Sequence, residues 1–222
     1  MKIFLDKVTT QLQQNLPFVV YKKPSETNFK GVFQKNDTLF EVNDFNEKGF
    51  VFASFDGNQT YIIPEDQSDI INENWQKSNT DFIDKEIDIS NNTDKKRFED
   101  LVAKGIQAIK KNEFHKVVLS RKETINLNHF DLIEAFEKLV DLYSSTFVYC
   151  FFHPKVGIWL GATPEQLLKA NAVSFETISL AGTQKDTGST EIIWKNKEQE
   201  EQKFVTDYIV EKLNTVASNV LI

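Results

Sequence analysis

Acidic side chains and lysines are the groups through which this chain could do chemistry. The sequence contains none of the motifs GxGxxG, the Walker loop, HExxH or GxSxG, which accompany dinucleotide, phosphate, zinc-protease and serine-hydrolase sites. The three histidines, His115, His129 and His153, are scattered, and no cysteine–histidine pairing has the spacing of a metal site. A bound metal ion is therefore expected on carboxylates, which suits Mg²⁺.

Arginine is rare, which limits how the chain can hold anions. Of 26 basic residues, 24 are lysines, and the only arginines are Arg97 and Arg121. Arginine is the usual bidentate partner of carboxylate and phosphate groups. The chain therefore has few ways to hold a multiply anionic substrate by itself.

Lys116 lies in HKVVLSRKETI, which reads as a β-strand over residues 115–125. Alternation along a strand places Lys116 on the face of Val118 and Ser120. On local sequence alone the simplest interpretation is a solvated lysine, one of 24. A lysine that acts as a base near neutral pH needs a pKa well below its usual value of about 10.4, through burial or a neighbouring cation.

Glu165 follows Thr163 and Pro164 within GIWLGATPEQLL. These three residues fit the start of a helix, with threonine as the N-cap, proline at the first helical position and an acid in the first turn. A helix start is therefore the expectation that the local sequence favours for this segment.

Two features lie further along the chain. In SLAGT, Gly182 allows backbone N–H groups to approach an anion closely, and the alternative is an ordinary turn at the end of a strand. In KEQEEQKFV, Glu198 and Glu201 lie one helical turn apart on the same face. The alternative there is a solvated acidic face, with Lys197 and Glu201 as an i,i+4 ion pair of the weaker orientation.

Taken together and in order, FHKVVLSR, GIWLGATPEQLL and ETISLAGT resemble the chorismate-utilising enzyme family. This family includes isochorismate, salicylate, anthranilate and aminodeoxychorismate synthases. The resemblance covers the chain from about Asp94 to its end, the N-terminal part of the family's catalytic domain, and the spacing from Glu165 to Gly182 also matches. The first ninety residues resemble nothing specific.

The resemblance implies roles for the acid and base candidates. Lys116 stands where isochorismate and salicylate synthases keep a general-base lysine, whereas anthranilate and aminodeoxychorismate synthases usually have glutamine there. Glu165 corresponds to the family's general acid. Glu201 corresponds to a helix-borne carboxylate that binds Mg²⁺. Glu198 is expected either next to the metal or in contact with the groups that bind it.

The resemblance also implies a substrate loop. Ala181, Gly182 and Thr183 correspond to the loop that holds chorismate through backbone amides and a hydroxyl group. Aminodeoxychorismate synthases resemble this motif with a nucleophilic lysine at the position of Ala181. Its absence here removes that branch of the family.

The activity implied is that of an isochorismate synthase, with chorismate as substrate and Mg²⁺ as cofactor. Water adds at C2, the C4 hydroxyl leaves, and the product feeds menaquinone or siderophore synthesis. The alternatives are a salicylate synthase and a non-catalytic chorismate-binding or scaffold domain. Family members continue for over a hundred residues with a second metal-binding glutamate, so we expect a truncated chain that is inactive alone.

The expected fold is α+β, a mixed and mostly antiparallel sheet with flanking helices. Residues 1–92 read as a variable, β-rich region of short strands, and residues 93–222 as the first part of the catalytic domain. A polar linker is expected around the boundary at Asn92. Apolar spacing predicts helices over 94–112, 132–140 and 196–216, and TFVYCFFH predicts a buried strand.

Composition narrows the function classes. The 222 residues carry a net charge of −7 with a pI near 5.1, which argues against a nucleic-acid or anionic-membrane binder. No apolar run approaches the roughly 18–20 residues of a membrane span, and MKIFLDKVTTQLQQNLPF lacks the apolar block of a signal peptide. We expect a cytoplasmic protein, of an oligomeric state that the sequence leaves open.

Overall fold

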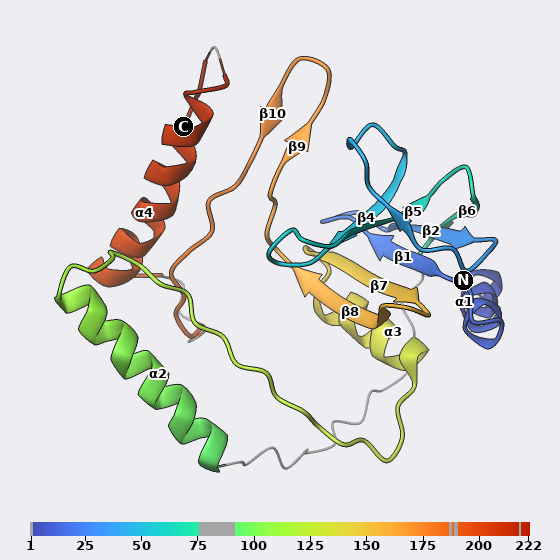
Figure 1. Ribbon diagram of the computed structural model, residues 1–222, viewed down its shortest axis with the longest axis horizontal. Coiled ribbons are helices and arrows are strands. Elements are labelled where there is room, and N and C mark those ends of the chain that lie inside the picture. The colour runs from blue at the N-terminus through green and yellow to red at the C-terminus, as the bar shows by residue number, and fades with distance from the viewer. Residues whose placement is uncertain (1, 76–91, 187, 189–190, 218) are drawn as a thin grey trace. The chain divides into compact units, whose positions relative to one another are not determined.

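The computed structural model describes residues 2–75, 92–186, 188, 191–217 and 219–222 (Figure 1). The chain divides into two units, of which the first comprises Met1–Asp84 with Asn128–Glu165. The second comprises Lys85–Leu127 with Gln166–Ile222. The linker expected around Asn92 falls largely on residues 76–91, outside the described residues.

A five-stranded antiparallel sheet forms the centre of the first unit, in the order β6-β2-β1-β7-β8. Its strands are β1 (Phe18–Lys22), β2 (Asn28–Gln34), β6 (Ser68–Asn74), β7 (Phe147–His153) and β8 (Gly157–Thr163). The sheet therefore combines strands from both sides of residue 92. The expected fold class, α+β with a mostly antiparallel sheet, is confirmed, with four helices in the described residues.

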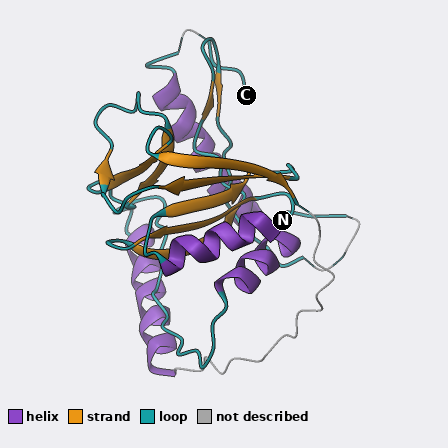
Figure 2. Ribbon diagram, turned by 90° about the vertical axis from the view of Figure 1, so that its right-hand side faces the viewer, coloured by secondary structure: helices purple, strands orange, loops and turns teal. Residues whose placement is uncertain are grey.

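Two helices, α1 (Lys2–Gln13) and α3 (Leu132–Leu142), cover one face of this sheet (Figure 2). Helix α3 begins where predicted, and the side chain of its N-cap Asp131 accepts hydrogen bonds from the N–H groups of Ile133 and Glu134. Helix α1 was not predicted, although its Phe4 and Val8 have the i,i+4 spacing of a buried stripe. The core beneath the helices is mainly aromatic and branched: Phe4, Val8, Phe18, Val20, Phe29, Phe33, Leu132, Phe136, Val140, Val148, Cys150 and Phe152.

A smaller sheet packs on the five-stranded sheet through a second core. Its strands are β3 (Phe40–Glu41), β4 (Gly49–Ala53) and β5 (Thr60–Pro64), in the order β3-β5-β4. The Phe52 and Phe151 rings stack with centroids 4.3 Å apart. This contact joins the two sheets, so the first unit has a core on each face of its central strands.

The second unit contains α2 (Asn92–Lys110), α4 (Asn196–Leu213) and a short hairpin of β9 (Lys169–Ala170) and β10 (Phe175–Glu176). The two helices confirm the predictions made from apolar spacing for residues 94–112 and 196–216. Every residue of the buried core belongs to the first unit, and α4 has no buried residue among those described. None of the described helices is long and apolar enough to cross a membrane.

The strand predicted over residues 115–125 is wrong. The described residues 114–131 form no strand or helix, because no neighbouring strand supplies a hydrogen-bonded ladder. The segment instead lies along α2, where a Cβ on Gly105 would be 3.4 Å from both Val117 Cγ1 and Leu119 Cδ1. The alternation expected of an extended chain is kept, since Val117 and Leu119 share the face toward α2.

Cys150 provides a probe of the intact first unit. Burial raises the pKa of its thiol to about 12, so almost none of it is thiolate at about pH 8. We expect the native chain to resist Ellman's reagent, and the chain in urea to react within minutes. Rapid labelling of the native chain would contradict the packing of β7.

His153 gives the first unit a pH-dependent stability. Burial lowers the pKa of its imidazole, whose Nδ1 accepts a hydrogen bond from the Lys155 N–H over 3.1 Å. A lowered folded-state pKa means that stability is present above pH 6.5 and is lost as pH falls through the folded pKa, by about 1.4 kcal/mol per unit of pKa difference. We expect the melting temperature between about pH 7.5 and pH 5 to fall less in His153→Gln than in the native chain. Equal slopes would contradict this.

Candidate functional site

Three segments of the second unit meet at the first turns of α4. We call the residues at this meeting point, Lys116, Gly182, Lys197, Glu198 and Glu201, the α4 cluster. Four of them are site residues predicted from the sequence. They come from positions up to 85 apart in the chain, so their meeting is a property of the tertiary structure.

Gly182 contacts the backbone of α4. It adopts a φ of +75°, and a Cβ added to it would lie 2.7 Å from the carbonyl oxygen of Glu198. Ser179 Oγ and Thr206 Oγ1 are hydrogen-bonded at 3.0 Å and hold the same segment against the helix about two turns further on. The glycine is therefore required both by its backbone conformation and by this close approach.

Lys116 reaches α4 from the extended segment that follows α2. The His115 ring stacks on the Phe204 ring at 6.0 Å between centroids, which brings the segment beside the helix. Lys116 Nζ then lies 3.6 Å from Glu201 Oε1, with the lysine side chain 23% exposed. The solvated lysine of the local interpretation is therefore a partly buried member of an ion pair.

Glu201 has two ammonium neighbours. Lys197 Nζ is 3.2 Å from Glu201 Oε2 and, with a smaller contribution from Lys116, holds the pKa of this carboxyl below its usual range. The i,i+4 pair expected on a solvated acidic face is thus formed. In this arrangement Lys116 is engaged in an ion pair, whereas a general base must be a neutral amine.

The acids of α4 fit part of a magnesium site. The side chain of Glu198 is only 12% exposed, and its buried Oε2 has no hydrogen-bond partner among the described residues. An unpartnered carboxylate oxygen one turn from a second carboxylate is a suitable donor for Mg²⁺, which takes about six oxygen ligands. No group of three or more acids, histidines or cysteines that could hold a metal ion occurs in the described part of the chain, so these two acids need further ligands.

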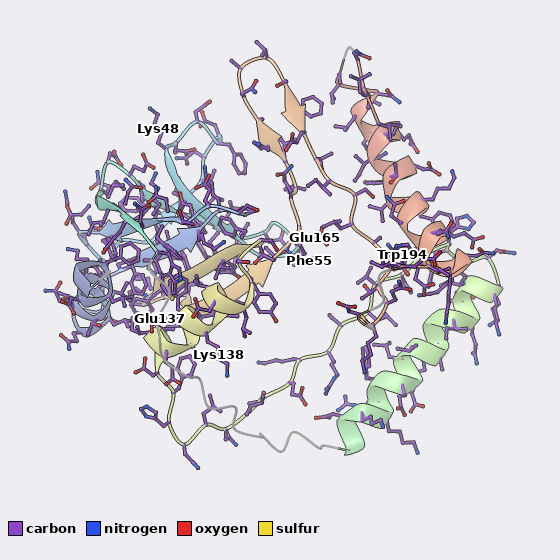
Figure 3. The ribbon with its side chains drawn as sticks, turned by 180° about the vertical axis from the view of Figure 1, so that it is seen from behind. Lys48, Phe55, Glu137, Lys138, Glu165 and Trp194 are labelled. Carbon is purple, nitrogen blue, oxygen red and sulfur yellow. The ribbon has the colours of Figure 1, made fainter. Side chains whose placement is uncertain are left out.

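The loop beside Glu198 borders a hollow of about 660 Å³. Ala181 and Glu198 line it, together with Trp194 and Gln199, and the Gln199 amide donates to the Trp194 carbonyl over 2.9 Å. Thr183 is exposed. Trp194 (Figure 3) was not predicted as a site residue, and nothing in its local sequence singles it out.

Glu165 belongs to the first unit (Figure 3). The Thr163 Oγ1 accepts a hydrogen bond from the Glu165 N–H over 3.1 Å, as an N-cap would. No helix follows in the described residues, so the helix-start interpretation is wrong. Pro164 and Glu165 are exposed after the end of β8.

The two properties of Gly182, its contact with α4 and its positive φ, can be tested separately. Gly188 has a similar φ of +70° but no heavy atom within 4 Å of an added Cβ. We expect Gly182→Ala to speed hydrogen exchange of the first α4 amides about tenfold, because the loop must leave the helix. Gly188→Ala is the control and should leave these amides unchanged. Equal effects of both substitutions would contradict the packing described.

Comparisons with known proteins show the family of the chain. The family model described as chorismate binding enzyme matches residues 62–222, more than half of the chain. Component 1 of anthranilate synthase from Aeropyrum pernix is 36% identical over 102 residues, which is 45% of this chain and 22% of that protein. The match therefore spans about a fifth of the relative's length. No solved structure matches.

Proposed function

The chain belongs to the chorismate-binding enzyme family, and from that premise we propose that it forms part of an enzyme that interconverts chorismate and isochorismate. The observation that supports this activity is Lys116, at the position where the resemblance implies a general base. Its Nζ lies 3.6 Å from Glu201 and shares the α4 cluster with Gly182 and Glu198. The isochorismate formed is a precursor of the kind that menaquinone and siderophore syntheses consume.

In the proposed reaction, Lys116 as a neutral amine takes a proton from a water molecule whose oxygen forms a bond to C2. The two ring double bonds shift, the C4–O bond breaks, and Glu165 gives a proton to the departing hydroxide. One water is added and one is lost, so no oxidant or reductant is needed.

The substrate loop, together with Mg²⁺ held by the acids of α4, would hold the chorismate carboxylates. Backbone N–H groups at Ala181 and Gly182 and the Thr183 hydroxyl are the proposed donors. Glu198 and Glu201 would hold Mg²⁺, which supplies positive charge opposite a substrate carboxylate. Because Lys116 and Lys197 contact Glu201 in the structure, both must move away before Glu201 can serve as a ligand.

A second candidate activity is suggested by the similarity to an anthranilate synthase component. Such an enzyme replaces the C4 hydroxyl with an amino group at C2 and eliminates pyruvate. Lys116 favours water over ammonia as the nucleophile, because the resemblance places glutamine there in anthranilate synthases. Salicylate synthase shares the lysine and adds pyruvate elimination.

The test is product identification. Chorismate and Mg²⁺ are incubated, with and without ammonium, with the 222-residue chain and with the longest natural reading frame that contains it. We expect isochorismate without pyruvate from the longer protein, independent of ammonium, and little turnover from the 222 residues alone, whose described part holds no group of three or more possible metal ligands. Anthranilate or salicylate with pyruvate would assign the other activities, and chorismate binding without turnover in either protein would indicate a scaffold domain.

A further inference from the structure

Two contacts attach the start of the substrate loop to α4. Gly182 approaches the carbonyl oxygen of Glu198, and Thr206 Oγ1 donates a hydrogen bond to Ser179 Oγ over 3.0 Å. Glu198 and Thr206 are eight residues apart on the helix, which corresponds to a rise of about 12 Å. The segment from Ser179 to Gly182 therefore runs antiparallel to α4.

This segment has almost no spare length between its two contacts. Three residue steps of extended chain span at most about 10–11 Å, which is close to the rise of about 12 Å between the two helix residues that they contact. Leu180 and Ala181 lie between the contacts and are therefore held in one extended path. Loss of either contact would allow them to move away from the helix.

The backbone donors of the substrate loop are unpaired. Among the described residues, the N–H groups of Ala181 and Gly182 make no hydrogen bond, and both residues are partly buried. Such N–H groups can bind an anion without first losing another partner, provided that the backbone holds them in place. Their affinity for a carboxylate therefore depends on how firmly the segment is attached to α4.

The Thr206 hydroxyl group is itself oriented by α4. Its Oγ1 accepts a hydrogen bond from Gln202 Nε2 over 2.9 Å, one helical turn earlier. A hydroxyl group has one hydrogen to donate, and Ser179 Oγ at 3.0 Å is a nearer acceptor than the Gln202 carbonyl oxygen at 3.3 Å. Ser179 and Thr206 are both partly buried, so water competes less for this bond than for an exposed one.

We propose that Ser179 and Thr206 are positioning residues of the substrate loop, whose hydrogen bond holds the N–H groups of Ala181 and Gly182 where a substrate carboxylate binds. This inference rests on the proposed function. The carboxylate does not react, so the loop binds the substrate and the transition state about equally. Loosening the loop therefore raises the KM for chorismate and leaves kcat nearly unchanged.

The experiment removes the Thr206 hydroxyl group and follows the loop and the substrate separately. In the 222-residue chain, Thr206→Val is expected to lower the ¹⁵N order parameters of Ala181 and Gly182 from about 0.85 to below about 0.6. In the longer natural protein it should raise the KM for chorismate about threefold to tenfold, with kcat within about twofold. Thr206→Ser keeps the hydroxyl group and should restore the native values.

Thr215→Val is the matched control. Thr215 Oγ1 donates to the Lys212 carbonyl over 2.7 Å just after α4, so this substitution removes a local hydrogen bond and leaves the Ser179 contact in place. Valine has nearly the helix propensity of threonine. Ser179→Ala should reproduce Thr206→Val, and the double variant should show no more than either single change, because both groups act through one bond.

Unchanged order parameters in Thr206→Val, an equal effect of Thr215→Val, or additive effects of the two single changes would overturn the proposal. So would a mobile loop with an unchanged KM, or a lower kcat at constant KM, which is the result of losing native protein. A product other than isochorismate would overturn only the proposed activity, since the order parameters and the KM report on the loop whatever product forms. If no product forms, the dissociation constant of chorismate replaces KM.

Discussion

Replacing Lys116 with glutamine is expected to lower isochorismate formation by about 100-fold to 10,000-fold, the range that a general base contributes. Glutamine keeps much of the length and polarity of the lysine but cannot accept the proton of the attacking water. The affinity for chorismate should stay within about threefold, because the proposed binding groups lie on the substrate loop and on α4. Steady-state kinetics with chorismate and Mg²⁺, on the longer natural protein, measure both quantities.

Lys95→Gln is the charge-matched control for this prediction. Lys95 is exposed on α2 and pairs with Glu99 at i,i+4, so its loss should leave the turnover unchanged. If Lys116→Gln instead weakened chorismate binding while turnover per bound substrate remained the same, Lys116 would hold the substrate and the base assignment would be wrong.

Replacing Phe18 with alanine is expected to destabilise the first unit by about 3–5 kcal/mol. Phe18 is fully buried at the middle of the main sheet, opposite Phe33 on β2 and Phe152 on β7. Its ring centroid lies 6.2 Å and 5.8 Å from theirs. Since a domain is stable by only about 5–15 kcal/mol in total, this one cavity removes a large part of the margin. Urea unfolding followed by near-ultraviolet circular dichroism measures the change.

Phe55 provides the control for the same chemical change. It lies at the surface (Figure 3) with its side chain fully exposed. Phe55→Ala should change the free energy of unfolding by less than about 0.5 kcal/mol. Similar losses for both substitutions would contradict the assignment of the core to the aromatic residues of β1, β2 and β7.

Local spacing predicted the helices and buried strands well, because these depend on residues close in the chain. The apolar residues of α2, α3 and α4 recur at helical intervals, and the continuous apolar run of β7 matches a strand buried on both faces. Helix α1 is not predicted, although Phe4 and Val8 have helical spacing and are buried. The segment 115–125 has the composition of a strand, but a strand also requires a pairing partner, which local sequence cannot supply.

The lysines illustrate the same limit. Lys22 is 3% exposed and donates to the carbonyl groups of Ser144 and Thr146, more than a hundred residues away. Nothing in FVVYKK distinguishes it from the solvated lysines, because its burial depends on the loop after α3. Lys116 likewise became a candidate through an ordered set of motifs, and its contact with Glu201 required α4 to be in place.

The sequence by itself therefore determined the fold class, three of the four helices in the described residues and the chemical family, since these follow from periodicity and from motifs with fixed spacing. Tertiary structure alone decided that β7 and β8 complete the sheet begun by β1 and β2. It also decided that Glu201 meets Lys116 and that Ser179 bonds to Thr206. The physical reason is that hydrogen-bond ladders, ion pairs and burial join residues far apart in the chain, and their free energies exist only once the chain has brought those residues together.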